Sequence, residues 1–156
     1  MKIGLISDTH DNTPPVKLAA RFFAEQGVDL VIHLGDVMDP ETLTLLQGLP
    51  LQVVRGNNED ERAWPDSWTA ELEGVRVFAT HGHMRNQLHA SFGKADVALH
   101  GHTHRRRKET VAGTLVVNPG ALYRCFTKSV AILELPSKHV AFFEVREDGV
   151  VPMRHD

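Results

Sequence analysis

The chain has 156 residues, 42% of them hydrophobic, and its 17 Lys and Arg against 20 Asp and Glu give a formal net charge of -3. We expect one domain, residues 1–156, with a core that needs no disulfide or structural metal. The charge balance excludes a strong nucleic-acid footprint. The single cysteine, Cys125, forms no internal disulfide, which favours the cytoplasm. The apolar stretch 3–6 is too short for a secretion signal or a membrane span, so no membrane association is expected.

The first third of the chain is predicted to alternate strands and helices. Short apolar runs at 2–7, 30–34 and 51–54 predict buried strands. Between them, 14–26 has apolar residues at helical spacing, and 41–47 has the pattern of a short helix. This alternation predicts βαβ units with a parallel sheet.

The rest of the chain is predicted to contain hairpins. Three pairs of strands are expected, 69–72 with 75–80, 107–111 with 115–117, and 130–135 with 140–145, together with a helix at 86–92 and a strand at 97–99. Hairpins imply antiparallel pairing, and these strands are too many for one small sheet. The sequence therefore predicts an α/β fold in which two sheets pack face to face and helices flank them.

Five polar clusters each begin where a predicted strand ends. In α/β sheets the carboxyl ends of strands converge on the ligand-binding edge. Asp, Asn and His crowded on that edge would leave unpaired polar atoms unless a positive ion neutralised them. Metal ions are the expected partners. The clusters are Asp8-Thr9-His10, Gly35-Asp36, Gly56-Asn57-Asn58-Glu59, Thr80-His81-Gly82 and Gly101-His102-Thr103-His104.

The candidate ligands combine imidazole, carboxylate and amide oxygen without thiolate. Such a set suits Mn²⁺, Fe²⁺, Zn²⁺ or Ni²⁺. Seven ligands are too many for one tetrahedral ion, whereas two ions that share a carboxylate would use them all and could clamp the oxygens of phosphoryl transfer. The seven are Asp8, His10, Asp36, Asn57, His81, His102 and His104.

The order of these motifs resembles that of the calcineurin-like metallophosphoesterases. Asp-x-His, Gly-Asp, Gly-Asn-x-Glu, His-Gly and Gly-His-x-His follow one another from Asp8 to His104. The chain length, the Gly-His-Thr-His cluster and Asn118-Pro119-Gly120 are most similar to the small prokaryotic phosphodiesterase branch. The resemblance implies a four-layer α/β sandwich of two packed mixed sheets flanked by helices, in agreement with the two sheets inferred above.

The resemblance also implies a metal-dependent phosphodiesterase that acts on a small phosphodiester through two divalent ions. Mn²⁺ is the expected metal, with Fe²⁺, Ni²⁺ or Zn²⁺ as alternatives, and a hydroxide that bridges the ions would attack phosphorus. Asp36 would bridge the two ions. The implied ligands are Asp8, His10, Asp36 and His104 for the first ion and Asp36, Asn57, His81 and His102 for the second.

Two further residues are candidates for catalysis. Many family members carry a histidine at the position of Asn58, where it protonates the leaving group, and Asp39 matches the acidic residue that orients that histidine. Asn58 can donate a hydrogen bond to a phosphoryl oxygen but is not a general acid. His83 is the second candidate, as a contact to the phosphate or as a bystander.

Other functions remain open at this level. One alternative is a phosphomonoesterase, which would use the same site. The other is a non-catalytic protein-interaction scaffold, because the retromer scaffold subunit shares this fold but has lost metal ligands. All seven positions here carry competent ligands. The basic run 105–108 is interpreted as a solvated strand end in preference to an attractor of anionic substrate. The sequence leaves open whether the chain forms a homo-oligomer.

Overall fold

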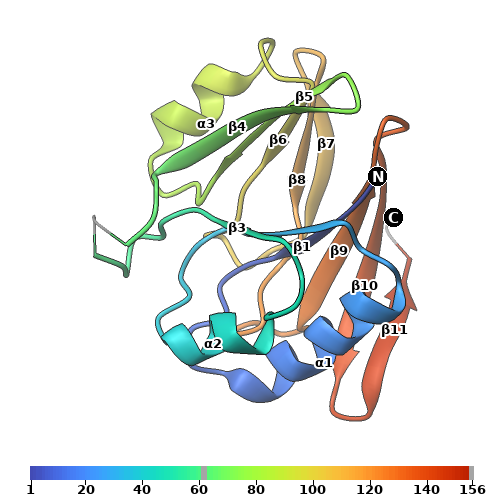
Figure 1. The fold of residues 1–156 in the computed structure, drawn as a ribbon. Helices are drawn as coiled ribbons and strands as arrows, with labels where there is room; N and C mark the ends of the chain where they lie inside the picture. The colour runs from blue at the N-terminus through green and yellow to red at the C-terminus, as the bar shows by residue number, and fades with distance from the viewer. Residues whose placement is uncertain (61–62, 155–156) are drawn as a thin grey trace.

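The computed structural model describes residues 1–60 and 63–154. It contains a six-stranded sheet of order β11-β10-β9-β1-β2-β3 and a five-stranded sheet of order β4-β5-β6-β8-β7 (Figure 1). In chain order the elements are β1 (Lys2–Ile6), α1 (Thr13–Glu25), β2 (Leu30–His33), α2 (Pro40–Leu45), β3 (Leu51–Val53), β4 (Ser67–Leu72), β5 (Val75–Thr80), α3 (Arg85–Ser91), β6 (Val97–Leu99), β7 (Arg107–Val111), β8 (Thr114–Asn118), β9 (Ser129–Glu134), β10 (His139–Arg146) and β11 (Gly149–Met153).

Both sheets are mixed, as predicted. Strands β1, β2 and β3 pair in parallel, whereas β9, β10 and β11 extend the first sheet with antiparallel pairs. In the second sheet β5, β6 and β8 are parallel, and β4 and β7 are antiparallel edges. The three predicted hairpins are confirmed as β4–β5, β7–β8 and β9–β10.

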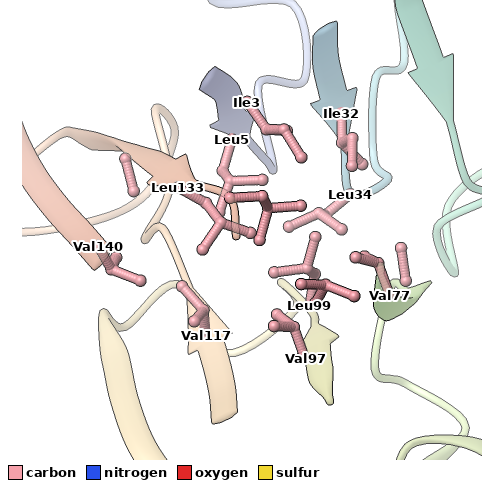
Figure 2. Packing of buried hydrophobic residues seen from close by; sticks show 14 of the residues in the cluster. Ile3, Leu5, Ile32, Leu34, Val77, Val97, Leu99, Val117, Leu133 and Val140 are labelled. Carbon is pink, nitrogen blue, oxygen red and sulfur yellow. The ribbon is translucent and has the colours of Figure 1, made fainter. Parts of the chain in front are cut away.

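The core is divided between the two faces of the first sheet, because side chains alternate along a strand. On β1, Ile3 and Leu5 point toward the second sheet, where they join Leu99 and Val117 in one apolar cluster (Figure 2). Ile6 belongs to a second cluster, which packs the same sheet against α1. The result is the predicted four-layer sandwich, with α1 and α2 outside one sheet and α3 outside the other (Figure 1).

A glycine on β1 allows the helix to approach this sheet. A Cβ atom added to Gly4 would lie 3.0 Å from the ring of Phe23, a fully buried residue of α1. The close packing fixes β1 at the centre of the sheet, so the loop that follows it starts from a rigid position.

One strand was not predicted. Strand β11 pairs with β10 at the edge of the first sheet and contains Pro152. Its short sequence has little hydrophobic alternation, and an edge strand is where a proline is tolerated. Among the described residues, no helix is long and apolar enough to cross a membrane.

Candidate metal centre

The carboxyl ends of β1, β2, β5 and β6 converge on one edge between the two sheets. The loops that follow these strands, together with the loop after β3, carry the seven predicted ligands. The structure brings all seven together through a connected set of short contacts. These contacts include His104–Asp8, His81–Asp8, His81–Asp36, His10–Asp36, Asn57–His81 and Asn57–His102.

The backbone is left-handed at most of these ligands. Positive φ values between 46° and 70° occur at Asp8, His10, Asp36, His102 and His104. This conformation is unfavourable for residues other than glycine, and such strain persists only where the surroundings impose it. Here the loops hold one another, since Asp8 donates its N–H to Gly35 and His10 donates to Asp36, both at 3.0 Å. The strained backbone turns successive side chains toward one point.

Three glycines let the loops approach closely enough to meet. A Cβ on Gly35 would lie 2.6 Å from His81 Nδ1, and one on Gly56 would overlap the carboxylate of Asp36. A Cβ on Gly101 would overlap the hydroxyl of Ser7. These positions require glycine because the functional side chains occupy the space that a methyl group would need.

Asp8 is fully buried, yet only one of its carboxylate oxygens is satisfied. Oδ2 accepts hydrogen bonds from Ser7 Oγ at 2.6 Å and from the backbone N–H of His102 at 3.1 Å. Oδ1 has no hydrogen-bond partner. Burial alone would raise the pKa of Asp8, but the neighbouring His104 ring, whose Nε2 lies 3.2 Å from Oδ1, and the charge of His81 hold it below its usual value. Asp8 is therefore a buried anion whose free oxygen faces the site.

Asp36 is held by the loop that follows β3. Asn58 donates to both of its oxygens, from its backbone N–H at 3.1 Å and from Nδ2 at 2.9 Å. The pKa of Asp36 lies well below its usual range, since the contact with His81 and the two hydrogen bonds outweigh the effect of burial. Like Asp8, it stays ionised at neutral pH.

Glu59 supports this loop in a way that the sequence did not predict. Its carboxylate accepts backbone hydrogen bonds from Asp36 at 2.8 Å, Gly56 at 2.9 Å and Val37 at 3.2 Å. Glu59 thereby joins the loop after β2 to the loop after β3. The sequence places Glu59 in the Gly-Asn-x-Glu motif, but the motif does not indicate that its carboxylate joins two loops.

Two histidines are oriented by backbone carbonyls, which accept but cannot donate. His81 donates from Nδ1 to Leu34 O at 2.7 Å, and His104 donates from Nδ1 to Arg124 O at 3.2 Å. In the neutral imidazole this leaves the Nε2 lone pair facing the site. The fixed tautomer is the one that a metal ligand requires.

Asn57 contacts two of the candidate histidine ligands through its side-chain oxygen. Its Oδ1 lies 2.9 Å from His81 Nε2 and 3.2 Å from His102 Nδ1. With His81 neutral, two lone pairs would face each other at 2.9 Å, which is unfavourable unless a proton or a metal ion lies between them. Burial lowers the pKa of His81, but the hydrogen bond to Asp36 and the charges of both aspartates raise it overall.

His10 completes the cluster. Its Nε2 is buried without a hydrogen-bond partner, 3.7 Å from Asp36 Oδ2, and its ring centroid lies 4.2 Å from that of Tyr123. Two sets of ligand atoms come within metal-binding range, Asp8 with His10 and His104, and Asp8 with Asp36 and His81. Both sets fit a divalent cation in donor type and in unsatisfied polar atoms. Asp8 belongs to both sets and Asp36 to one.

The two catalytic candidates occupy different environments. The side-chain amide of Asn58 is already bonded to Asp36, so it positions that carboxylate, whereas the sequence suggested that it contacts a phosphoryl oxygen. His83 Nδ1 is buried without a partner, and its ring centroid lies 5.4 Å from that of His81. Burial, followed by the charges of His81 and Arg55, lowers the pKa of His83. Asp39 caps the N-terminus of α2 by accepting from Glu41 N at 2.9 Å.

His33 supports the site from beneath. It is fully buried at the end of β2, and its Nδ1 accepts the N–H of Gly35 at 3.1 Å. Nε2 then carries the proton and donates to Thr9 Oγ1 at 2.9 Å. Burial lowers the pKa of His33 to about 4, which keeps the ring neutral. The ring links the loops that carry Asp8 and Asp36.

Comparisons with known proteins agree with this geometry. The sequence-family model for the calcineurin-like phosphoesterase superfamily domain matches residues 1–138 of this chain. A phosphodiesterase of Methanocaldococcus jannaschii is 32% identical over 158 residues, with 88% of this chain and 95% of the relative covered. A phosphodiesterase of Escherichia coli is 27% identical, with 78% of this chain and 79% of the relative covered.

Solved structures share the fold. An archaeal phosphodiesterase has a TM-score of 0.83 at 31% identity, with 92% of this chain and 99% of that chain covered. A variant of Vps29 from Entamoeba histolytica has a TM-score of 0.78 at 20% identity, with 100% of this chain and 99% of that chain covered. The second likeness concerns the fold alone.

Proposed function

Because the chain belongs to the calcineurin-like phosphoesterase superfamily, we propose that its strand-end cluster holds two divalent metal ions and hydrolyses small phosphodiesters. Mn²⁺ is the proposed metal and the cytoplasm the proposed location, with residues 1–156 acting as one phosphoesterase domain. The observation that carries the metal site is the set of unsatisfied polar atoms. Asp8 Oδ1 and His10 Nε2 are buried without hydrogen-bond partners.

The proposed ligands are the seven residues that the sequence indicated. Asp8, His10 and His104 hold one ion and Asn57, His81 and His102 the other, with Asp36 between them. When bound, two such ions supply an activated water as the attacking hydroxide and the positive charge that phosphoryl transfer needs. Buried Asp8 and Asp36 provide fixed negative charge, and the carbonyls of Leu34 and Arg124 hold His81 and His104 in the ligating tautomer.

The side chains near the site also determine whether the leaving group can be protonated. A neutral His83 can donate one N–H to a phosphoryl oxygen but is a weak proton donor at pH 7. Asn58 is not an acid and is engaged with Asp36. We infer that hydrolysis favours esters with acidic alcohols, because no side chain that faces the site from the described residues is a strong general acid.

Hydrolysis of bis-p-nitrophenyl phosphate tests the proposal. The protein is stripped with a chelator, reloaded with Mn²⁺ and compared on this diester and on p-nitrophenyl phosphate. We expect activity on the diester, its loss on chelation and its return with Mn²⁺. Faster hydrolysis of the monoester would favour the phosphomonoesterase. Hydrolysis of neither substrate by metal-loaded protein would favour an interaction scaffold.

A further inference from the structure

A basic pocket of about 600 Å³ adjoins the metal centre at His104. It lies between the loop after β6 and the loop that joins β8 to β9. Among the residues that the structure describes, no carboxylate lines it. Its charged or polar lining comes from Thr103, His104, Arg105, Arg106, Arg124, Thr127 and Ser129.

The structure divides the basic run 105–108 into two parts. Arg105 and Arg106 line the pocket, where Arg124 joins them from a distant part of the chain. Arg107 bonds instead to Glu109 at 2.6 Å, and Lys108 lies exposed on β7. The sequence favoured a solvated strand end for the whole run. Arg105, Arg106 and Lys108 are all exposed, in agreement with that interpretation, but the two arginines also line a pocket together with Arg124.

The three pocket arginines form no ion pair in the described part of the chain, as is also true of Arg21, Arg85 and Arg154. Arg76 pairs with Asp96 at 3.0 Å, and Arg146 pairs with Glu144 at 2.9 Å. Within residues 1–60 and 63–154, neither Arg105 nor Arg106 nor Arg124 forms an ion pair. Three arginines that line one pocket make it a positively charged site in a chain of net charge -3, and the Arg106 guanidinium donates a hydrogen bond to an uncharged atom, Met153 Sδ, at 3.5 Å. Planar guanidinium donors match the oxygens of a phosphate group.

The wall that carries Arg124 is fixed to the metal centre. His104 Nδ1 donates to the carbonyl of Arg124 at 3.2 Å, and Asn12 Nδ2 donates to the carbonyl of Leu122 at 2.8 Å. The guanidinium of Arg124 lies 5.2 Å from the ring centroid of Tyr123, which in turn packs on His10. The pocket and the metal ligands are therefore parts of one framework.

The rim and floor suit a group larger than a single anion. Phe126 projects fully into solvent at the rim, so its ring offers an apolar face for a sugar or a base. Beside the pocket, a Cβ added to Gly120 would overlap the hydroxyl of Ser129 and lie 3.2 Å from Arg106 Cγ, so the glycine leaves room for both side chains.

We propose that this pocket binds a second phosphate, carried on one ester arm of the substrate. This inference rests on the proposed function and narrows its substrate class to phosphodiesters whose alcohol bears a further phosphate, such as a phosphorylated nucleoside. The scissile phosphodiester lies at the metal centre. The arm then extends past His104 so that its own phosphate meets the three guanidinium groups.

A matched pair of substrates tests the proposal. The p-nitrophenyl ester of thymidine 5′-phosphate is compared with the same ester carrying a 3′-phosphate. Both release p-nitrophenol from the same bond, so only the extra phosphate differs. We expect kcat/KM to be about tenfold higher with the 3′-phosphate, since hydrogen bonds to a charged group contribute about that factor. A ratio of the two kcat/KM values of one or below would contradict phosphate binding in the pocket. If neither ester is hydrolysed, the proposed function itself is contradicted.

Variants then locate the effect. Replacing Arg105, Arg106 and Arg124 with glutamine, singly and together, should bring the ratio of the two kcat/KM values toward one. Lys108→Gln removes a charge from the same run outside the pocket and should keep the wild-type ratio. Equal reduction in Lys108→Gln and the arginine variants would assign the preference to general electrostatic attraction and overturn the site.

Binding without turnover gives a second readout. Calorimetry compares thymidine 3′,5′-bisphosphate with thymidine 5′-phosphate on Mn²⁺-loaded protein. The bisphosphate should bind about tenfold more tightly, and the triple arginine variant should lose that difference. Equal affinities in the wild type would contradict the proposal even if both esters are hydrolysed.

Discussion

Glycines at the two ends of the sheets perform different tasks. At the hairpin ends, Gly74 and Gly113 have φ values of 75° and 85°, and a Cβ on either would have nothing within 4 Å. At the ligand end, a Cβ on Gly56 or Gly101 would overlap polar side chains. The hairpin glycines serve the backbone alone, whereas the glycines at the metal centre make room for ligands. Substitutions that look alike in sequence should therefore have different consequences.

The largest expected effect is that of Gly56→Ala. The new methyl group would displace the carboxylate of Asp36, so we expect at least a 100-fold loss of Mn²⁺-dependent diesterase activity, in line with the cost of misplacing catalytic groups. Activity and urea unfolding are measured on the same preparation.

Gly113→Ala is the matched control. It should keep its activity and lose about 1–2 kcal/mol in the free energy of unfolding, the cost of a left-handed backbone with a side chain. Equal activity losses in the two variants would remove the distinction between the two ends of the sheets.

Serines offer a second comparison. Ser7 donates to Asp8 Oδ2 at 2.6 Å, whereas Ser137 donates to Glu134 O at 3.3 Å in an exposed turn. Ser7→Ala should weaken Mn²⁺ binding about 10- to 100-fold, because groups that orient ligands contribute that much to metal affinity. Ser137→Ala should bind Mn²⁺ like the wild type. Calorimetric titration with Mn²⁺ measures the two affinities. Unchanged affinity in Ser7→Ala would mean that Asp8 binds the metal without the hydrogen bond from Ser7.

The buried His33 should make stability depend on pH. Burial keeps the folded-state ring neutral down to about pH 4, whereas the ring in the unfolded chain takes up a proton below about pH 6.5. The contribution of neutral His33 to the free energy of unfolding is therefore present above pH 6.5 and is lost as the pH falls toward 4. For this group we expect a loss of about 2 kcal/mol in the free energy of unfolding between pH 7 and pH 5.

Urea unfolding of chelated protein at the two pH values measures this loss. His33→Gln should be less stable than the wild type at pH 7 but should show the smaller decrease toward pH 5. A variant as sensitive to pH as the wild type would show that other groups cause the acid instability.

The smallest expected effect is that of Asn58→Ala. The substitution removes the Nδ2 bond to Asp36 but keeps the backbone N–H bond to the same carboxylate. We expect about a tenfold decrease in kcat on bis-p-nitrophenyl phosphate, since one hydrogen bond to a charged group is lost. The decrease should be the same for acidic and for poor leaving groups. A larger loss with poor leaving groups would assign Asn58 a direct hydrogen bond to the departing alcohol oxygen.

The sequence was sufficient to predict most strands of the two sheets and the convergence of the polar clusters on one edge. Strands and hairpins follow from short-range hydrophobic patterns, and polar residues at strand ends must converge once the strands are parallel. Strand β11 was not predicted because it is stabilised by pairing with β10 and has no clear hydrophobic pattern of its own.

Contacts between distant loops could not be predicted in the same way. The position of Arg124 beside His104 depends on a loop that is 20 residues away in the chain. The carboxylate of Glu59 and the amide of Asn58 are defined by the backbone atoms they meet, which no local pattern encodes. The tertiary structure alone shows which arginines of the basic run face the pocket.

The number of Mn²⁺ ions bound by the wild type and by Asp36→Asn tests the central claim most directly. Asp36 lies between His10 and His81, at 3.7 Å and 3.5 Å from their Nε2 atoms, so weakening its charge should loosen both ions. Equilibrium dialysis should give two ions per wild-type chain and a marked loss of both in the variant. A single ion in the wild type, or one ion retained at wild-type affinity in Asp36→Asn, would contradict a dinuclear centre shared through Asp36.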